Sequence, residues 1–378
     1  MIRAAAKNFR DVLVVTDAGD YEEVLLRLRE GRNDLSYREQ MAAKAFRYTS
    51  YYDALIAEYF NKRLSVSAPE YLSMSYRLGT SLRYGDNPHQ AAAFYEKVYE
   101  ENPAEWKQLH GKELSYNNYT DMYNAVRFVK EFSEPAVVGT KHNNPAGIGI
   151  GDTIDEAFDK AYACDATSLF GGIFALNRPV TKHIAEVLHS FFMEIVIAPE
   201  YEEEALSILE EKKNLRVIAM PNLPTFSLPK KTVKEVLGGI LVQDYNYANL
   251  SEEMEVVSAR KPTEEEMRDL LFGFKAVKMV ASNGAVLVKD GATLGIGQGE
   301  VRRSWAVEEA LSRAEGKLSG AVLASDGFFF NDTVELLQKN GIRAVIQPGG
   351  SVKDPEVIAL CDQYGIALVM THIRHFRH

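Results

Sequence analysis

Six short apolar runs rich in β-branched residues limit most strongly what this chain can fold into. Each run has the length and composition of a buried strand. Helical patterns lie between some of them, one at about Glu264–Met279 behind a Thr263/Glu266 capping box and one over Trp305–Ala314. This alternation predicts an α/β fold of several layers. The runs are AVVGT (136–140), IVIAP (195–199), AVLVK (285–289), AVLAS (321–325), AVIQP (344–348) and ALVMT (367–371).

The connections between the runs indicate the kind of sheet. Asp290–Gly291 is a hairpin signal between two strands, so we expect a mixed sheet rather than a purely parallel one. The segment KHNNPAG (141–147) follows the first run and is expected to be a loop. A helix then opens with Thr153 and Glu156 as a second capping box.

The first 66 residues have a different pattern. VLVVT (12–16) predicts a buried strand, and a helix over Tyr21–Glu30 follows with Asp20 as its cap. A longer helix is expected over Tyr37–Arg63, opened by a Ser36/Glu39 capping box. The polar, proline-containing stretch behind it predicts a linker. One strand and two helices are too few for a complete α/β domain.

Charge and composition exclude several classes of protein. The net charge of −10 argues against a general nucleic-acid binder, so clustered cations in this chain are informative. Two cysteines exclude a disulfide framework and a cysteine-rich zinc site, and no other metal-binding motif is present. No run approaches the roughly 20 apolar residues that span a bilayer. We therefore expect a cytoplasmic protein without membrane or nucleic-acid partners.

Two polar clusters are candidates for chemistry. Lys141 and His142 are adjacent in KHNNPAG and could supply a base and a cationic stabiliser to one reacting centre. The alternative is a polar turn with a solvated lysine. The segment RYGDNPHQ (83–90) suits a binding loop, although as a bare pattern it could equally be a surface turn.

Three further segments suggest anion binding. GIGQG (295–299) lacks the spacing of a dinucleotide fingerprint, and we expect close approach of its backbone to a ligand, with Arg303 on an anion. Gly349–Ser351 resembles an anion or carboxylate cradle before a helix. The basic tail THIRHFRH (371–378) is either disordered or anchored by its interleaved Ile373 and Phe376, and we expect the anchored form.

Together these segments resemble the transformylase part of a bifunctional purine-biosynthesis enzyme family. That part formylates aminoimidazole carboxamide ribotide (AICAR), and the other part is inosine monophosphate (IMP) cyclohydrolase. The resemblance implies two cytidine-deaminase-like subdomains without the deaminase zinc, and a homodimer. It rests on LRYGDNPHQ, LSYNN (114–118), KHNNPAG, SLFGGI (168–173), IAPEYEEEAL (197–206), GGILVQD (238–244), KMVASN (278–283), GIGQG, ASDGFF (324–329), QPGGS (347–351) and RHFRH.

The resemblance also implies a domain plan. Residues 1–66 are similar to the end of the cyclohydrolase domain, residues 67–80 are a linker, and residues 81–378 form the transformylase domain, with a subdomain boundary at roughly 230–260. Lys7, within MIRAAAKN, matches a catalytic lysine of the cyclohydrolase. The other nucleotide-binding segments of that domain have no counterpart here, so we expect no cyclohydrolase activity from this chain alone.

The resemblance finally implies the reaction and its residues. The formyl group of 10-formyltetrahydrofolate, a co-substrate, passes to the AICAR amine without a catalytic metal. His142 is the base, and Lys141 stabilises the developing charge or protonates the leaving nitrogen. The alternatives are a non-catalytic nucleotide- or folate-binding subunit and, more remotely, a zinc deaminase. AICAR is expected on Arg83, Tyr84, Gly171, Glu194, Asn283, Arg303, Phe328 and Arg374, and folate on Ser304, Asp332, Ser351 and Val352.

Overall fold

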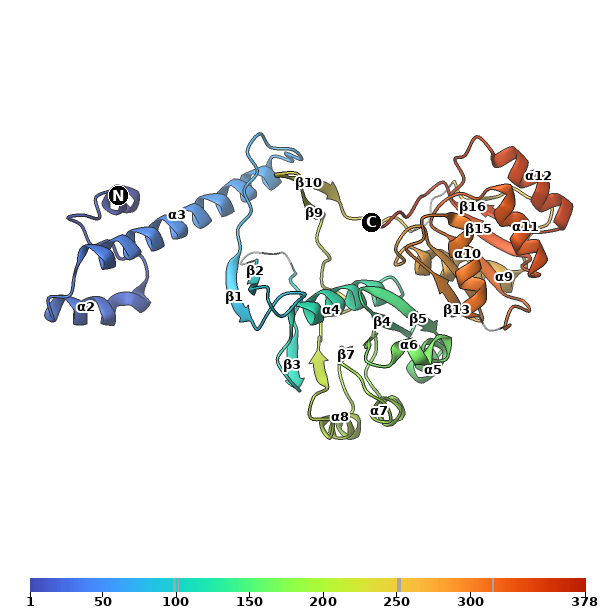
Figure 1. Cartoon of the computed structure of the whole chain (residues 1–378), viewed down its shortest axis with the longest axis horizontal. Helices are drawn as coiled ribbons and strands as arrows, with labels where there is room; N and C mark the ends of the chain where they lie inside the picture. The colour runs from blue at the N-terminus through green and yellow to red at the C-terminus, as the bar shows by residue number, and fades with distance from the viewer. Residues whose placement is uncertain (98–99, 101, 250–252, 315) are drawn as a thin grey trace. The chain divides into compact units, whose positions relative to one another are not determined.

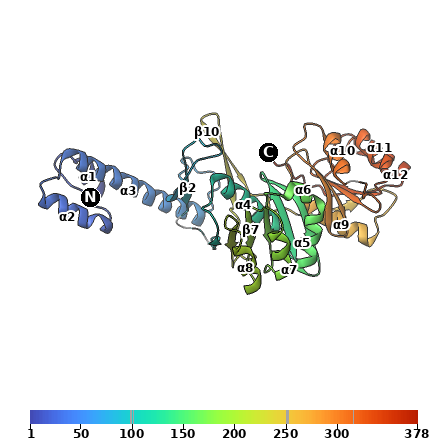
Figure 2. The same ribbon diagram turned by 60° about the horizontal axis from the view of Figure 1, so that its bottom comes forward.

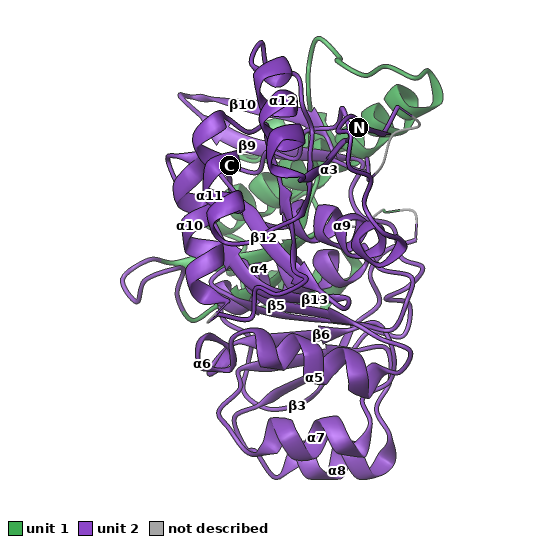
Figure 3. Cartoon of the chain, turned by 90° about the vertical axis from the view of Figure 1, so that its right-hand side faces the viewer, with its two compact units in different colours: residues 1–83, 91–101 green, residues 84–90, 102–378 purple. Residues whose placement is uncertain are grey.

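The chain divides into two compact units, which are coloured separately in Figure 3. The computed structural model describes residues 1–97, 100, 102–249, 253–314 and 316–378. Unit 1 comprises Met1–Arg83 and Ala91–Glu101, and unit 2 comprises Tyr84–Gln90 and Asn102–His378.

Unit 1 is mainly helical. The 29-residue helix α3 is its longest element (Figure 1). A two-stranded antiparallel sheet follows, and its first strand begins inside the stretch that we expected to be a linker. The elements are α1 (Ile2–Lys7), a 3-10 turn (Ala18–Asp20), α2 (Tyr21–Arg29), α3 (Leu35–Arg63), β1 (Arg77–Leu82) and β2 (Ala92–Glu96).

The predicted strand at residues 12–16 is wrong. These residues belong to none of the sheets of the described chain. Their side chains alternate as in a strand, because Val14 packs with Ala6 and Ala45 while Leu13 and Val15 pack against the cluster of Val24 and Met41. A strand also needs a neighbour for its backbone groups, and the apolar pattern does not report whether one exists.

The two predicted caps in this unit are also wrong, although both helices are present. The Asp20 side chain accepts hydrogen bonds from Lys44 Nζ, at 2.7 and 2.8 Å, and leaves the start of α2 uncapped. Helix α3 begins two residues earlier than predicted, with Asp34 accepting from the backbone N–H of Tyr37. At α2, the expected cap Asp20 is therefore engaged in an ion pair with Lys44, and at α3 the cap is Asp34 in place of the expected Ser36.

Unit 2 is built on a mixed 12-stranded sheet. Its order is β11-β16-β15-β14-β12-β13-β5-β4-β6-β7-β8-β3. The six predicted strands of this region and the Asp290–Gly291 hairpin are all confirmed. The strands are β3 (Lys107–His110), β4 (Ala136–Lys141), β5 (Asn144–Ile150), β6 (Ile173–Leu176), β7 (Ile195–Ala198), β8 (Arg216–Ala219), β11 (Glu255–Val256), β12 (Ala285–Lys289), β13 (Ala292–Gly297), β14 (Val322–Ser325), β15 (Ala344–Gln347) and β16 (Ala367–Met370).

The two halves of this sheet share one order of elements. In each half, an antiparallel hairpin is followed along the sequence by three strands that run parallel to one another. The first of the three pairs antiparallel with one strand of the hairpin, and a short antiparallel strand pairs with the last of them at the edge of the sheet. The halves meet where β5 pairs with β13. The mixed α/β class is therefore confirmed, while the likeness of each half to cytidine deaminases stays a prediction. In the sequence, a separate hairpin of β9 (Lys231–Val236) and β10 (Gly239–Asp244) lies in the connection between the two halves. Residues 250–252 of the same connection lie outside the described residues.

Helices cover both faces of the sheet, because its strands are apolar on both sides. Helices α4 and α9 share one core cluster on one face. On the other face, α5, α7 and α8 cover the first half and α10, α11 and α12 the second (Figure 2). The helices are α4 (Tyr116–Val129), α5 (Ile154–Cys164), α6 (Ala166–Leu169), α7 (Lys182–His189), α8 (Glu203–Glu210), α9 (Glu264–Val277), α10 (Arg303–Arg313), α11 (Asn331–Lys339) and α12 (Asp354–Tyr364).

The cap predictions in unit 2 had mixed outcomes. The Thr263/Glu266 capping box of α9 is complete, with both reciprocal hydrogen bonds. At α5, Thr153 accepts from the N–H of Glu156, but the Glu156 side chain accepts from Asp152 instead of closing the box. None of the helices in the described chain is both long and apolar enough to cross a membrane.

The glycine-rich run packs against a helix, which corrects the expected approach to a ligand. Gly295 and Gly297 lie inside β13, under α10. A Cβ atom at Gly297 would stand 1.8 Å from the carbonyl oxygen of Ala306, and one at Gly295 would stand 2.1 Å from that of Ala310. These glycines therefore allow α10 to lie directly on the strand.

Candidate functional site

Strand directions bring the predicted site residues of unit 2 to one edge of the sheet. Because β4 and β5, β5 and β13, and β13 and β12 all pair antiparallel, the carboxyl end of β4 and the amino end of β12 point the same way. The amino ends of β6 and β7 and the carboxyl ends of β14, β15 and β16 then reach the same edge. Lys141, Glu194 and Asn283 are thus on the same edge as Phe328 and Arg374.

The first half contributes a group around Lys141. Lys141 ends β4, and its Nζ donates to the carbonyl oxygen of Phe170 at 2.8 Å. The next residue, Gly171, has φ 71°, and its N–H donates to Phe192. The N–H of Glu194 donates to the carbonyl of Gly172, and the Glu194 carboxylate pairs with Arg216. The structure therefore brings three predicted residues, Lys141, Gly171 and Glu194, together.

The expected KHNNPAG loop is instead a tight hairpin, because β5 begins at Asn144. Lys141 pairs with Asn144 across the turn. The two residues between them, His142 and Asn143, have φ values of 51° and 66°. Two consecutive left-handed residues suit a type I′ hairpin turn, although the usual residue there is glycine. The turn leaves the His142 side chain exposed.

Asp121 on α4 holds this turn from the side. Its Oδ1 accepts the backbone N–H of Asn143 at 2.6 Å. Burial raises the pKa of the Asp121 carboxyl. The hydrogen bond from the Asn143 N–H and the nearby His142 oppose this rise, while the negative charge of Glu194 adds to it. Asp121 thus lies within electrostatic range of two predicted site residues, His142 and Glu194.

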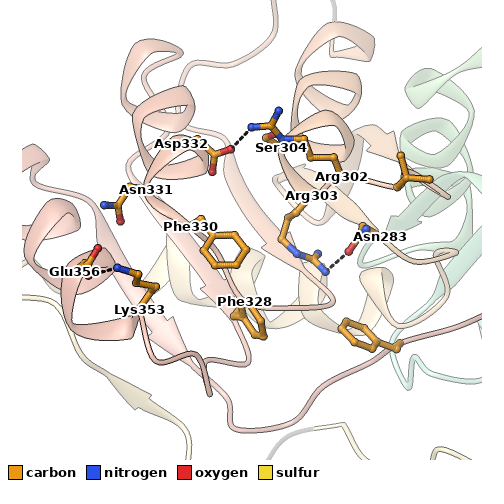
Figure 4. A pocket seen from close by; sticks show the side chains of 12 residues that line it. Asn283, Arg302, Arg303, Ser304, Phe328, Phe330, Asn331, Asp332, Lys353 and Glu356 are labelled. Atoms are coloured by element: carbon orange, nitrogen blue, oxygen red, sulfur yellow. Dashed lines mark hydrogen bonds and ion pairs between the residues drawn. The ribbon is translucent and has the colours of Figure 1, made fainter.

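The second half contributes a cleft of about 610 Å³ (Figure 4). It contains five predicted residues: Asn283, Arg303 and Phe328 from the expected AICAR set, and Ser304 and Asp332 from the expected folate set. Of the remaining lining residues, the sequence had singled out only Phe376, as an anchor of the tail. These remaining residues are Val301, Arg302, Phe330, Asn331, Lys353, Glu356 and Phe376.

Arg303 is the buried cation of this cleft. Its Nη1 pairs with Asp326 Oδ1 at 2.5 Å and donates to Ser325 Oγ at 2.8 Å, while Nη2 donates to Asn283 Oδ1 at 2.6 Å. The Asp326 side chain is fully buried. Gly327 allows this packing, since a Cβ there would lie 2.3 Å from Arg303 Nη2. Arg303 is thus held in one orientation beside the cleft.

The outer part of the cleft combines charge with aromatic rings. Arg302 pairs with Asp332 at 2.9 Å, and both side chains are exposed. Phe328 and Phe330 meet edge to face, with centroids 5.5 Å apart. A ligand with both an anionic group and a flat ring system matches this lining.

The basic tail is ordered along this cleft, as the anchored interpretation expected. Ile373 packs on the core and the N–H of His375 donates to the carbonyl of Asp326. Arg374 lies over the ring of Phe376, 4.6 Å from its centroid, and Phe376 lines the cleft. Arg374 is therefore at the cleft margin, while Arg303 is inside it.

The predicted anion cradle at Gly349–Ser351 already holds a carboxylate of this chain. The N–H groups of Gly350 and Ser351 both donate to Asp354 Oδ2, at 2.7 and 3.1 Å. The cradle thus holds a carboxylate at the start of α12, and the folate role expected for Ser351 stays a prediction. Val352 is almost fully exposed, and its neighbour Lys353 lines the cleft.

Three predicted residues lie elsewhere. Tyr84 opens the segment 84–90 of unit 2, which the hydrogen bond from the Gly85 N–H to the Gln90 carbonyl closes into a loop. Arg83 belongs to unit 1, and so does Lys7, which is exposed at the end of α1. Their roles stay predictions.

Sequence reasoning missed Asp121, Asp326 and Arg377. Asp326 lies within ASDGFF and Arg377 within RHFRH, so the motifs were noticed but the individual side chains were not. Asp121 sits in a helix whose pattern does not distinguish it. In the described part of the chain, no group of three or more His, Cys, Asp or Glu side chains is placed to hold a metal ion.

Fold and site together define an α/β protein with a Lys141–His142 turn and an arginine-lined cleft on one sheet edge. The model of one family, described as the AICARFT/IMPCHase bienzyme, matches residues 5–313. The chain belongs to this family, whose members act in purine biosynthesis.

Similar proteins extend the match over the whole chain. A bifunctional purine biosynthesis protein PurH of Oceanobacillus iheyensis is 50% identical over 382 residues, covering 100% of this chain and 75% of that protein. Proteins of the same description from Caldicellulosiruptor saccharolyticus and Clostridium botulinum are 49% and 50% identical, and cover 100% of this chain and 75% and 74% of those proteins.

Proposed function

We propose that this chain transfers the formyl group of 10-formyltetrahydrofolate to the 5-amino group of AICAR. The observation that carries the proposal is the Lys141–Asn144 turn, which holds a lysine and a histidine side by side on the sheet edge that also carries the arginine cleft. A transfer of this kind needs a base for the amine proton and a cation for the developing oxyanion. We infer the reaction from the family, and we assign the base to His142 and the cation to Lys141 of this turn.

In the proposed reaction, the AICAR amine nitrogen attacks the formyl carbon while His142 takes the proton that the amine loses. Lys141 stabilises the tetrahedral oxyanion, in which case protonated His142 passes its proton to N10, or Lys141 itself donates the proton to N10. The bond between the formyl carbon and N10 then breaks, leaving formyl-AICAR and tetrahydrofolate. Arg303 and Arg374 suit the 5′-phosphate of AICAR, and the Phe328–Phe330 pair suits flat rings.

An absorbance assay of tetrahydrofolate formation tests this function. Purified chain with AICAR and 10-formyltetrahydrofolate should form tetrahydrofolate and formyl-AICAR in equal amounts, and reactions without AICAR should form neither. Calorimetric binding of AICAR without any AICAR-dependent product would instead establish a non-catalytic binding subunit and overturn the proposal.

Arg374→Ala should weaken AICAR binding by roughly 1.5–3 kcal/mol, the size of a charge-assisted hydrogen bond. Its guanidinium lies over Phe376 at the cleft margin, so its loss should change thermal stability little. Calorimetric titration of AICAR measures the effect, with Arg313→Ala, a surface arginine on α10, as the matched control. An unchanged dissociation constant for Arg374→Ala would remove this residue from the site.

We also propose a cytoplasmic homodimer that uses the β9–β10 hairpin. Among the described residues, the two strands pair only with each other, and such an isolated hairpin has little stability alone. It exposes Val233, Ile240, Leu241 and Val242, which a second copy would cover. Sedimentation equilibrium should give twice the mass of one chain, and Leu241→Lys should shift the protein toward monomer. A monomeric wild-type protein would contradict the proposal.

A further inference from the structure

The catalytic turn is held at both polar backbone groups of Asn143. Its N–H donates to Asp121, as described above, and its carbonyl oxygen accepts from Arg377 Nη2 at 2.9 Å. Two adjacent non-glycine residues in the left-handed region are unfavourable, and such a conformation persists only where its surroundings enforce it. Asp121 and Arg377 hold this conformation from outside the turn.

Arg377 reaches several acceptors around the turn with one planar side chain. Its Nη1 donates to the carbonyl of Met279, at the end of the α9 region, and Nη2 also lies 3.3 Å from Asn124 Oδ1. The side-chain amides of Asn124 and Asn143 are themselves 2.7 Å apart. Burial, with the neighbouring charge of Arg127, lowers the pKa of Arg377 to about 10, so it stays charged at neutral pH.

The backbone of Arg377 connects the turn to the cleft of the other half. Its N–H donates to Ser282 Oγ at 3.0 Å, and its carbonyl accepts the Ser282 N–H at 2.9 Å. Ser282 Oγ in turn donates to Asp326 Oδ2 at 2.5 Å, and Asp326 pairs with Arg303. One unbroken path of hydrogen bonds thus runs from the turn in the first half to the buried arginine in the second.

We propose that Arg377 is a positioning residue for formyl transfer, which keeps the Lys141–Asn144 turn aligned with the Arg303 cleft. The inference rests on the proposed function. The base and the bound amine must be aligned to within about 1 Å, since larger errors cost on the order of 100-fold in rate. The Arg377 guanidinium bonds the carbonyls of Met279 and Asn143 through two separate nitrogens held in one plane, whereas a lysine would have to reach both from a single ammonium nitrogen on a flexible stem.

A cycle with His142 tests this role. Arg377→Lys should lower kcat about 10-fold while KM for AICAR changes less than about 3-fold, because alignment acts in the transition state. In a His142→Ala background the same change should cost less than about 2-fold, since it misplaces a base that is gone. Arg343→Lys is the matched control, because Arg343 also donates to a backbone carbonyl, that of Tyr364. It should leave kcat unchanged.

Equal losses in both backgrounds, or no loss in either, would overturn the inference. If Arg377→Lys does not fold, Arg377→Gln enters the same cycle. The His142 imidazole signal, assigned by NMR from its loss in His142→Ala, should move in Arg377→Lys and stay in Arg343→Lys. This NMR readout does not need turnover. An inactive wild-type protein would therefore refute the proposed function, whereas an unmoved His142 signal in Arg377→Lys would refute the positioning role of Arg377.

Discussion

Replacing His142 by alanine is expected to lower the turnover of formyl transfer by on the order of 100-fold or more, the usual size of a general-base contribution. AICAR binding should weaken much less. His142 projects from the tight Lys141–Asn144 turn as an exposed side chain, so alanine removes the proposed base without leaving a cavity in the core. Steady-state kinetics with AICAR as the varied substrate, together with calorimetry, separate the two effects.

His183→Ala is the matched control for this prediction. His183 is also an exposed histidine, paired with Asp159 at 3.1 Å on the helical face of the first half, away from the sheet edge that carries the turn. It should keep wild-type turnover. Near-normal turnover in His142→Ala would remove His142 as the base, whatever the behaviour of Lys141→Met, for which we also expect severe impairment.

The strands of unit 2 were predictable because burial on both faces leaves a strong trace in sequence. Val137 and Val138 point to opposite core clusters, and each is fully buried. Such a run is typical of an inner strand or a buried helix, and its length decides between them. The segment 12–16 has the same apolar composition, yet it has no strand partner among the described residues of unit 1. The composition of a segment indicates that its side chains are buried, but whether its backbone pairs as a strand depends on residues that are distant in the sequence.

The site was predictable only as far as its motifs were local. Lys141 and His142 could be read directly, because one turn carries both. The supports of that turn come from α4, 22 residues earlier, and from the tail, 234 residues later, and no short pattern joins Asp121 or Arg377 to Asn143. At Gly349–Ser351 the pattern predicted a carboxylate cradle but not that a nearby aspartate of the same chain, Asp354, would supply the carboxylate.

The last prediction concerns stability and compares two aspartates that pair with consecutive arginines. Asp326 pairs with Arg303 and is fully buried, whereas Asp332 pairs with Arg302 and is exposed. Removing one member of a buried pair leaves an uncompensated charge and costs about 3–5 kcal/mol, while an exposed pair contributes about 0–1 kcal/mol. Asp326→Ala should therefore greatly reduce the free energy of unfolding, and Asp332→Ala should barely change it.

Urea unfolding followed by fluorescence measures both variants, and a third variant isolates the cause. Arg303→Met combined with Asp326→Leu removes both charges, so it should recover much of the stability that Asp326→Ala loses, although it removes the cleft's cation. If the double variant were as unstable as Asp326→Ala, lost packing and the lost hydrogen bond from Ser282 would explain the effect. Equal stability of Asp326→Ala and Asp332→Ala would mean that the pair is not buried as described. The expected ordering instead makes Arg303 a cation that the fold keeps at the cleft only because Asp326 compensates it.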